Sequence, residues 1–330
     1  MTESPTTLFH SPEWCAVLAD TYGFSPEANV LLDESGVPRA GFVYVRIEDA
    51  MDPRVVSLPF SDFCDPIVRD LSDWEALSSD LIGADQRIHL RCVHSDVPLA
   101  DPRFETAGKA RWHAIDVDRD LDDIWSALHS GARQSIRKAR NEGVEIRVAQ
   151  DKGDLRSFFD LHLAVRKRKY RLLAQPFRFF EQIWDHLVAR DRGVLLLGLH
   201  KGRVVSGIMF LEWQHSLFYK FNASDNSLLS ARPNDVLIWA GIEHARSRGL
   251  RSLDFGVSDW DQEGLLRYKR KYATVEKTVS FLQRMPEGAP SMRERQLRGL
   301  LPQLTSVLVD PTVPDAATEA AGDVLYRLFV

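Results

Sequence analysis

The chain has 330 residues, 44% of them hydrophobic and 27% charged, which favours a globular protein of about two domains over a disordered, collagen-like or membrane-spanning one. Cys15, Cys64 and Cys92 form no paired motif, which argues against a disulfide framework or a zinc ribbon and fits a reducing compartment. The first residues lack the basic and apolar segments of a secretory leader, so we expect a cytoplasmic protein.

The formal net charge is −5, but the charges are unevenly distributed along the chain. Residues 1–125 carry 24 acidic against 10 basic side chains, whereas residues 126–285 carry 28 basic against 17 acidic ones. A basic region of this kind can attract a polyanion although the whole chain is acidic. It is equally typical of solvated helix faces, so charge alone leaves both interpretations open.

The first third of the chain reads as mixed helix and strand. Ser11 followed by Pro12 is typical of a helix start, and apolar residues follow at helical spacing. Alternating or short apolar runs predict the strands, and two further periodic segments predict helices. The expected strands are 28–32, 39–47, 54–58, 87–93 and 111–117, and the expected helices are 74–82 and 121–128.

The middle of the chain repeats this pattern and ends in a helical tail. We expect helices capped by Asp154 and Asn234, and a hairpin of strands around Lys201 and Gly202. Two helix-to-strand junctions, 139–144 and 245–250, are similar enough to hint at an internal duplication. The remaining expected elements are a helix at 180–188, strands at 217–221, 251–255 and 274–283, and an amphipathic helix near 324–330.

Several common catalytic motifs are missing from the sequence. It contains no phosphate-binding GxxxxGK[ST] loop, no GxGxxG after a strand, no HExxH and no GxSxG. The ten histidines show no metal-ligand spacing, and nothing indicates a Ser/His/Asp triad. We therefore expect no metal and no tightly bound cofactor.

Three short segments concentrate the positive charge. Residues 131–147, 166–171 and 267–271 together hold 14 of the 42 lysines and arginines. A ligand rich in phosphate would explain such clusters, and solvated helix ends would explain them equally well.

Two stretches combine a strand end with a polar loop, which is where α/β proteins usually bind ligands. In the first, Ser61, Asp62 and Phe63 follow a short strand. In the second, a strand carrying Asp254 ends near Gly256 and leads through a polar loop into a basic, aromatic segment. Asp254 could equally serve as a buried anchor for that loop.

These stretches resemble the Fem-type (FemABX) aminoacyltransferases and the related acyltransferase domains of the GNAT superfamily. The resemblance implies mixed α/β sheets in two tandem GNAT-like domains, residues 1–145 and 146–285, which face a shared cleft and precede a helical tail, residues 286–330. The matching segments, in one order over most of the chain, are 9–14 (FHSPEW), 57–64 (SLPFSDFC), 130–140 (SGARQSIRKAR), 253–256 (LDFG) and 264–269 (GLLRYK).

Family members transfer an amino acid from aminoacyl-tRNA to an amine, typically of a peptidoglycan precursor. The resemblance therefore implies charged tRNA as co-substrate and an amine acceptor, either such a precursor or another small molecule or peptide. A lysine that follows an aromatic residue in the late helix is important for catalysis in the family, and it matches Lys269 after Tyr268 here. The expected state is a monomer or homodimer. The residues expected to bind substrate are Ser61, Asp62, Phe63, Arg166, Arg168, Tyr219, Asp254, Ser258 and Arg270.

Two alternatives remain open. Acyl-CoA-dependent GNAT enzymes place a glycine-containing loop before the central helix, where backbone N–H groups hold the pyrophosphate. Residues 230–235 (SARPND) contain no glycine, which weakens this alternative. An acyl-CoA N-acyltransferase of polysaccharide or natural-product biosynthesis is still the second hypothesis, and a non-catalytic RNA- or anion-binding module is the third.

Overall fold

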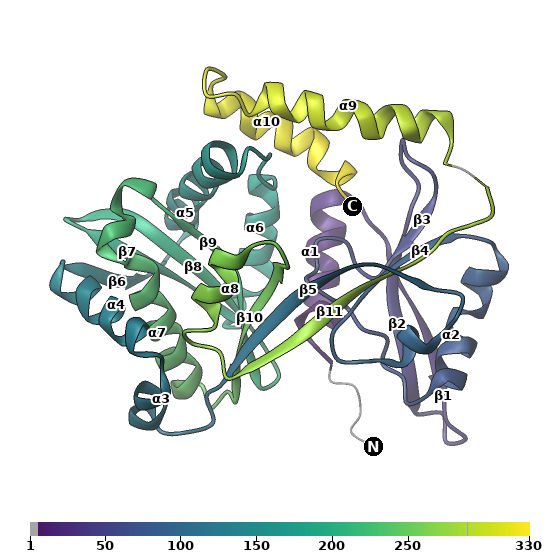
Figure 1. Cartoon of the computed structure of the whole chain (residues 1–330), viewed down its shortest axis with the longest axis horizontal. Helices are drawn as coiled ribbons and strands as arrows, with labels where there is room; N and C mark the ends of the chain where they lie inside the picture. The colour runs from purple at the N-terminus through teal and green to yellow at the C-terminus, as the bar shows by residue number, and fades with distance from the viewer. Residues whose placement is uncertain (1–5, 289) are drawn as a thin grey trace.

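The computed structural model describes residues 6–288 and 290–330, so residues 1–5, considered above for a leader, lie outside it (Figure 1). The strands are β1 (Pro26–Leu32), β2 (Pro38–Ile47), β3 (Arg54–Val56), β4 (Arg87–Cys92), β5 (Glu105–Asp116), β6 (Val144–Val148), β7 (Gly193–His200), β8 (Arg203–Trp213), β9 (Ser216–Ser224), β10 (Ser252–Asp259) and β11 (Val275–Arg284). The α-helices are α1 (Pro12–Tyr22), α2 (Leu71–Gly83), α3 (Leu121–Ala127), α4 (Ser130–Asn141), α5 (Lys152–Ala164), α6 (Phe177–His186), α7 (Pro233–Ser247), α8 (Glu263–Lys269), α9 (Met292–Leu308) and α10 (Asp315–Leu325).

One eleven-stranded mixed sheet runs through the molecule in the order β1-β2-β3-β4-β11-β5-β10-β9-β8-β7-β6. The long strands β5 and β11 pair with each other in the middle of the sheet (Figure 1). They join an N-terminal half, with strands β1–β4, to a C-terminal half, with strands β6–β10, because β11 also pairs with β4 and β5 also pairs with β10. The predicted mixed α/β fold class is confirmed.

Each half contains the same local unit, a helix that connects two parallel strands. In the N-terminal half α2 connects β3 to β4, and in the C-terminal half α7 connects β9 to β10. The junctions 139–144 and 245–250 lie, as expected, where helices α4 and α7 end before strands β6 and β10. The internal duplication that their similarity suggested stays a prediction.

Two predicted helix caps are wrong, for local reasons. Helix α5 is capped by Asp151, whose carboxylate accepts from the N–H groups of Gly153 and Asp154, while Asp154 pairs with Arg147. Helix α7 begins after Arg232, and Asn234 instead accepts a hydrogen bond from Ser224. In both cases an earlier residue has the extended or left-handed backbone that precedes the helix.

Helix α4 packs its apolar face with residues of α7 in one core cluster, so it is covered by the C-terminal half. Helix α1 packs against α6, with Trp14 edge-on to Phe179 at 5.9 Å between ring centroids. Elements of the first half thus extend over the second. The domain boundaries at residues 145 and 285 stay a prediction.

The C-terminal tail forms two helices, α9 and α10, which lie across one side of both halves (Figure 1). Glu294 of α9 is fully buried and pairs with Arg87 of β4 at 2.7 Å. At the other end, Glu319 of α10 accepts two hydrogen bonds from Arg156 of α5. The predicted helical tail is confirmed. None of the helices in the described part of the chain has the length and apolar character needed to cross a membrane.

Candidate functional site

The candidate site lies where β9 and β10 separate. The two strands pair only from Ser252–Asp254 with Ser216–Phe218, and each then continues without the other. Aromatic side chains of β9, β10 and the α8 region fill the space beyond this point, leaving a cavity of about 10 Å³, room for about one water. Its lining includes Tyr219, Phe255, Tyr268, Lys269 and Tyr272.

Lys269 is the buried cation of this site. Its side chain leaves α8 and its Nζ donates to the backbone carbonyls of Gly256 at 3.2 Å and Val257 at 3.0 Å. Burial lowers the pKa of Lys269 to about 8, although the nearby carboxylates of Asp62, Asp254 and Asp259 act in the opposite direction. Since an ammonium group has three donors, one N–H remains for a ligand oxygen.

Asp254 stands at the last residue where β10 pairs with β9. Its carboxylate accepts from the indole N–H of Trp112 at 2.8 Å and from the backbone N–H of Gly256 at 2.6 Å. Burial raises the pKa of Asp254 to about 7, and these two hydrogen bonds limit the rise. Asp254 therefore holds the strand end in shape and also places a titratable carboxyl close to Lys269.

Asp62 comes from the N-terminal half and meets the C-terminal half at Gly256. One carboxylate oxygen of Asp62 accepts from Nζ of Lys220 at 2.8 Å. The other lies 2.9 Å from the position that a Cβ on Gly256 would occupy, and Gly256 has φ +65°. A glycine is required here both for the left-handed backbone and for the close approach of Asp62.

Lys220 was missed by the sequence analysis. Its ammonium lies 4.7 Å from the ring centroid of Phe9 and 5.2 Å from that of Trp14, in addition to its bond to Asp62. The available signal was a lysine inside the otherwise apolar strand predicted at 217–221, because a charge in such a strand needs a partner. Trp112, which bonds Asp254, gave no comparable signal.

Two buried hydroxyl groups at the site, those of Tyr268 and Ser258, have no hydrogen-bond partner in the described part of the chain. Tyr219 packs against Phe255, and burial raises its pKa above the ordinary range of a tyrosine. A buried hydroxyl without a hydrogen bond costs folding free energy, so the hydroxyls of Tyr268 and Ser258 are available to a bound ligand or water.

Ser61 and Phe63 support the loop that carries Asp62. The Ser61 hydroxyl accepts from the Trp14 indole at 2.8 Å, and its carbonyl accepts from Arg91 at 2.8 Å. Phe63 is fully buried and packs edge-on against Phe9. Both residues hold the loop in place, and their roles toward a substrate stay predictions.

Three of the predicted substrate-binding arginines bond elsewhere in the chain. Arg166 donates to the carbonyl of Leu173, Arg168 pairs with Asp315 of the tail, and Arg270 pairs with Glu276. None of these three side chains is bonded to Lys269 or Asp62, although Arg270 directly follows Lys269 in the chain.

A basic recess adjoins α8 on its outer side. It has a volume of about 450 Å³ and is lined by Arg111, Trp260, Glu263, Leu266, Arg267 and Arg270. Arg111 and Arg270 both pair with Glu276, so Arg267 supplies most of its unpaired positive charge. The Arg111 guanidinium lies 3.9 Å from the ring centroid of Trp260, an indole that is 49% exposed. Exposed aromatic rings beside arginines are typical of surfaces that stack nucleic-acid bases.

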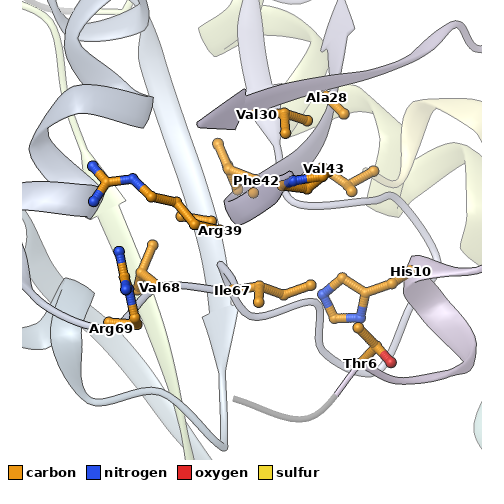
Figure 2. A pocket seen from close by; sticks show the side chains of 13 residues that line it. Thr6, His10, Ala28, Val30, Arg39, Phe42, Val43, Ile67, Val68 and Arg69 are labelled. Carbon is orange, nitrogen blue, oxygen red and sulfur yellow. The ribbon is translucent and has the colours of Figure 1, made fainter. Parts of the chain in front are cut away.

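Another cavity, of about 370 Å³, lies away from this chemistry in the N-terminal half. Figure 2 shows Arg39 and Arg69 at one end, His10 at the other and apolar side chains such as Phe42 between them. Both arginines pair with Asp73, which offsets their charge. None of the residues discussed above for Lys269 lines this cavity.

The N-terminus of α7, where acyl-CoA-dependent GNAT enzymes are expected to hold the pyrophosphate, carries residues that disfavour an anion. Pro233 supplies no N–H, and the buried Asp235 accepts from the Tyr272 hydroxyl at 2.6 Å. A carboxylate at this end of the helix repels an incoming pyrophosphate. In the described residues, no three His, Cys, Asp or Glu side chains are arranged to hold a metal ion.

Comparisons with known proteins agree with this architecture. The crystal structure of FemX matches with a TM-score of 0.64 at 14% identity, covering 92% of this chain and 96% of that one. The structure of L-PGS from Bacillus licheniformis matches with a TM-score of 0.55 at 13% identity, over 94% and 98% of the two chains. A tandem GNAT protein from the clavulanic acid biosynthesis pathway matches with 0.52 at 11% identity, over 86% and 90%.

At these identities the structural matches establish the fold alone, and no curated protein matches the sequence. The family model described as an acetyltransferase (GNAT) domain matches residues 103–270, about half of the chain. That segment includes β5, β10 and α8, and so contains Asp254 and Lys269. The Fem-type tandem arrangement is confirmed, and the chain belongs to the GNAT acetyltransferase family.

Proposed function

We propose that this acyltransferase moves an aminoacyl group from aminoacyl-tRNA to an amine acceptor. The observation that carries the proposal is Lys269, a buried ammonium with one unused N–H, set between Asp62 and Asp254 where the two halves meet. The acceptor expected from the Fem resemblance is an amine of a peptidoglycan precursor or of another small molecule or peptide.

The reaction needs positioning and charge stabilisation more than covalent help, because an aminoacyl ester is already activated. The amine lone pair forms the new C–N bond, the ester C–O bond breaks, and one proton moves from the amine to the departing ribose oxygen. In this proposal Lys269 donates its remaining N–H to the oxygen that becomes negative. The Asp62 oxygen that does not bond Lys220 accepts the proton of the amine and passes it on to the ribose oxygen.

The basic recess beside α8 supports RNA as the source of the aminoacyl group. Arg111, Trp260 and Arg267 line it together, and stacking of a base on Trp260 would bring the end of a tRNA next to the helix that carries Lys269. Asp235 at the start of α7 argues against acyl-CoA, which is the competing donor.

Titration with fluorescent charged tRNA, with an acyl-CoA as competitor, tests the proposal. We expect binding that acyl-CoA does not displace and that weakens with salt, with a log–log slope near −4 if about six phosphates are contacted. Protection of the protein by acyl-CoA without tRNA binding would establish the acyl-CoA enzyme instead. Salt-sensitive tRNA binding with no transfer to any amine, and no effect of Lys269→Met, would indicate an RNA-binding module.

A further inference from the structure

A second cavity, of about 250 Å³, lies between β3, β4, β11 and the tail helix α9. Leu90 and its alternate neighbours on β4 pack in one core with residues of α2, so His89 and Arg91 point to the opposite face of the sheet. The polar lining of the cavity consists of three arginines and one histidine: Arg54, Arg91, Arg298 and His89. The tail therefore contributes one wall and one of the four basic side chains.

The protein's own carboxylates pair with only part of this charge. Asp49 binds both terminal nitrogens of Arg54, and Glu294 is shared by Arg298 and Arg87. Arg91 has no carboxylate partner in the described part of the chain. Its guanidinium donates to the Ser61 carbonyl and lies over the ring of Phe281.

Two further nitrogen groups, the Nε–H of Arg54 and the imidazole of His89, have no hydrogen-bond partner among the described residues. The Nε–H of Arg54 is buried and makes no hydrogen bond among the described residues. The imidazole of His89 likewise has no hydrogen bond there, and burial together with the surrounding arginines lowers its pKa to about 4. An anion in the cavity would receive hydrogen bonds from the terminal nitrogens of Arg91, which have no carboxylate partner, and from the N–H of a neutral His89.

We infer that this cavity binds a phosphate or diphosphate group. Guanidinium groups donate two parallel hydrogen bonds to phosphate oxygens, and a buried, partly aromatic lining strengthens that attraction. Arg91 connects the cavity to the loop of Asp62, because it donates to the residue directly before Asp62. A phosphorylated acceptor can therefore place its anion here and its amine at Asp62, an assignment to the acceptor that rests on the proposed function.

Calorimetric titration of the full chain with inorganic pyrophosphate tests the binding itself. We expect binding that Arg91→Gln and Arg298→Gln each weaken roughly tenfold or more, because each change removes a charge-assisted donor. Arg295→Gln is the matched control, since Arg295 is exposed on the same helix but does not line the cavity. Thermal unfolding without ligand shows that the variants are folded.

Two results would overturn the site: no binding of pyrophosphate by the folded protein, or an equal loss of affinity in Arg295→Gln. The source of the anion is assigned in a second arm, which compares amine acceptors with and without a phosphate group. A preference for the phosphorylated amine that Arg91→Gln abolishes by raising KM supports the acceptor. Competition between pyrophosphate and uncharged tRNA would assign the cavity to the donor and overturn the acceptor assignment.

These arms also separate this inference from the proposed function. Pyrophosphate binding that depends on Arg91 would survive the discovery that the donor is acyl-CoA. Loss of pyrophosphate binding alone, with transfer from charged tRNA intact, would overturn the cavity assignment and leave the proposed reaction standing.

Discussion

Two segments of this chain, 166–171 and 267–271, look alike in sequence but differ in what surrounds their lysines. Both interleave lysine and arginine with a tyrosine. In the first, the Lys167 side chain is 1% exposed and pairs with Asp315 of the tail at 2.9 Å. In the second, Lys269 is also buried, at 5% exposed, but it bonds two backbone carbonyls and no carboxylate.

The difference lies in the partner that each fold supplies. A buried ammonium that is paired with a carboxylate has its charge balanced and fastens two parts of the chain together. Both ammonium groups use two of their three donors, but Lys269 is bonded to no carboxylate. Burial therefore lowers the pKa of Lys269, against the opposing effect of carboxylates that lie nearby without bonding it. The comparison predicts that one segment contributes to stability and the other to chemistry.

The largest expected effect is on catalysis at Lys269. Lys269→Met should lower kcat for aminoacyl transfer by roughly 10² to 10³, because it removes the donor aimed at the developing oxyanion. Single-turnover transfer from charged tRNA measures this, and Lys138→Met, at an exposed position on α4, is the control. An unchanged kcat with only KM raised would show that Lys269 tethers phosphate instead.

The second prediction concerns stability at the other segment. Asp315→Ala should destabilise the fold by about 1–3 kcal/mol, because Lys167 is left buried with only the Val313 carbonyl as partner. Thermal unfolding measures the loss, while the transfer rate per folded molecule stays the same. Asp310→Ala is the control, because Asp310 pairs with the exposed Arg171 at 3.9 Å and accepts two hydrogen bonds from Thr312, so its loss leaves no buried charge without a carboxylate.

A different outcome for Asp315→Ala would contradict the stabilising role expected of the segment 166–171. If the melting temperature held and transfer fell at least roughly tenfold, about 1.4 kcal/mol, the segment 166–171 would act in the reaction. The expectation that Arg166 and Arg168 bind substrate would then gain support despite their bonds within the chain.

The helices and strands could be predicted from the sequence where the residues that begin, end or turn an element lie next to it in the chain. The hairpin around Lys201 and Gly202 and the helix that starts at Pro12 follow from turn and cap residues that lie beside the apolar runs. The joining of the halves by β5 and β11 could not be predicted, because their residues are about 170 positions apart and pair without any repeated pattern.

The candidate site likewise has residues that the sequence could single out and contacts that it could not predict. Asp62 and Gly256 could each be singled out as polar or flexible positions after a strand. That Asp62 approaches the Gly256 backbone depends on how the two halves meet, which no local pattern records. Lys220 escaped because a single lysine in an apolar strand does not reveal which carboxylate will pair with it.

The contact between the halves can be tested at Gly256. Gly256→Ala adds a Cβ at φ +65° that lies 2.9 Å from an Asp62 oxygen, so Asp62 must move and disturb its bond to Lys220. Gly202→Ala is the matched control, since Gly202 has φ +75° and open space around its Cβ position. Both variants should lose about 1 kcal/mol of stability to backbone strain.

Only Gly256→Ala should also lose transfer activity, by roughly tenfold, because a misplaced positioning group weakens the alignment of the amine. Initial rates for the two variants at matched folded concentration measure this difference. Equal activity in both would show that the approach of Asp62 to Gly256 does not matter to the reaction.

The smallest expected effect is a shift in the alkaline pH limit. The proposed reaction needs the protonated form of Lys269, whose pKa is lowered to about 8, so kcat should fall tenfold per pH unit above that value. Asp259 is one of the carboxylates that hold this pKa up, and Asp259→Asn should therefore move the limit to lower pH by roughly half a unit or less. Asp261→Asn is the control, because it removes an exposed neighbouring carboxylate and should leave the alkaline limit unchanged.

Lys269→Arg tests whether Lys269 itself sets this limit, because a guanidinium does not titrate in this pH range. An alkaline limit that stayed in place in this variant would mean that another group sets it. Lys269 would then no longer differ from Lys167 in having a role in the reaction.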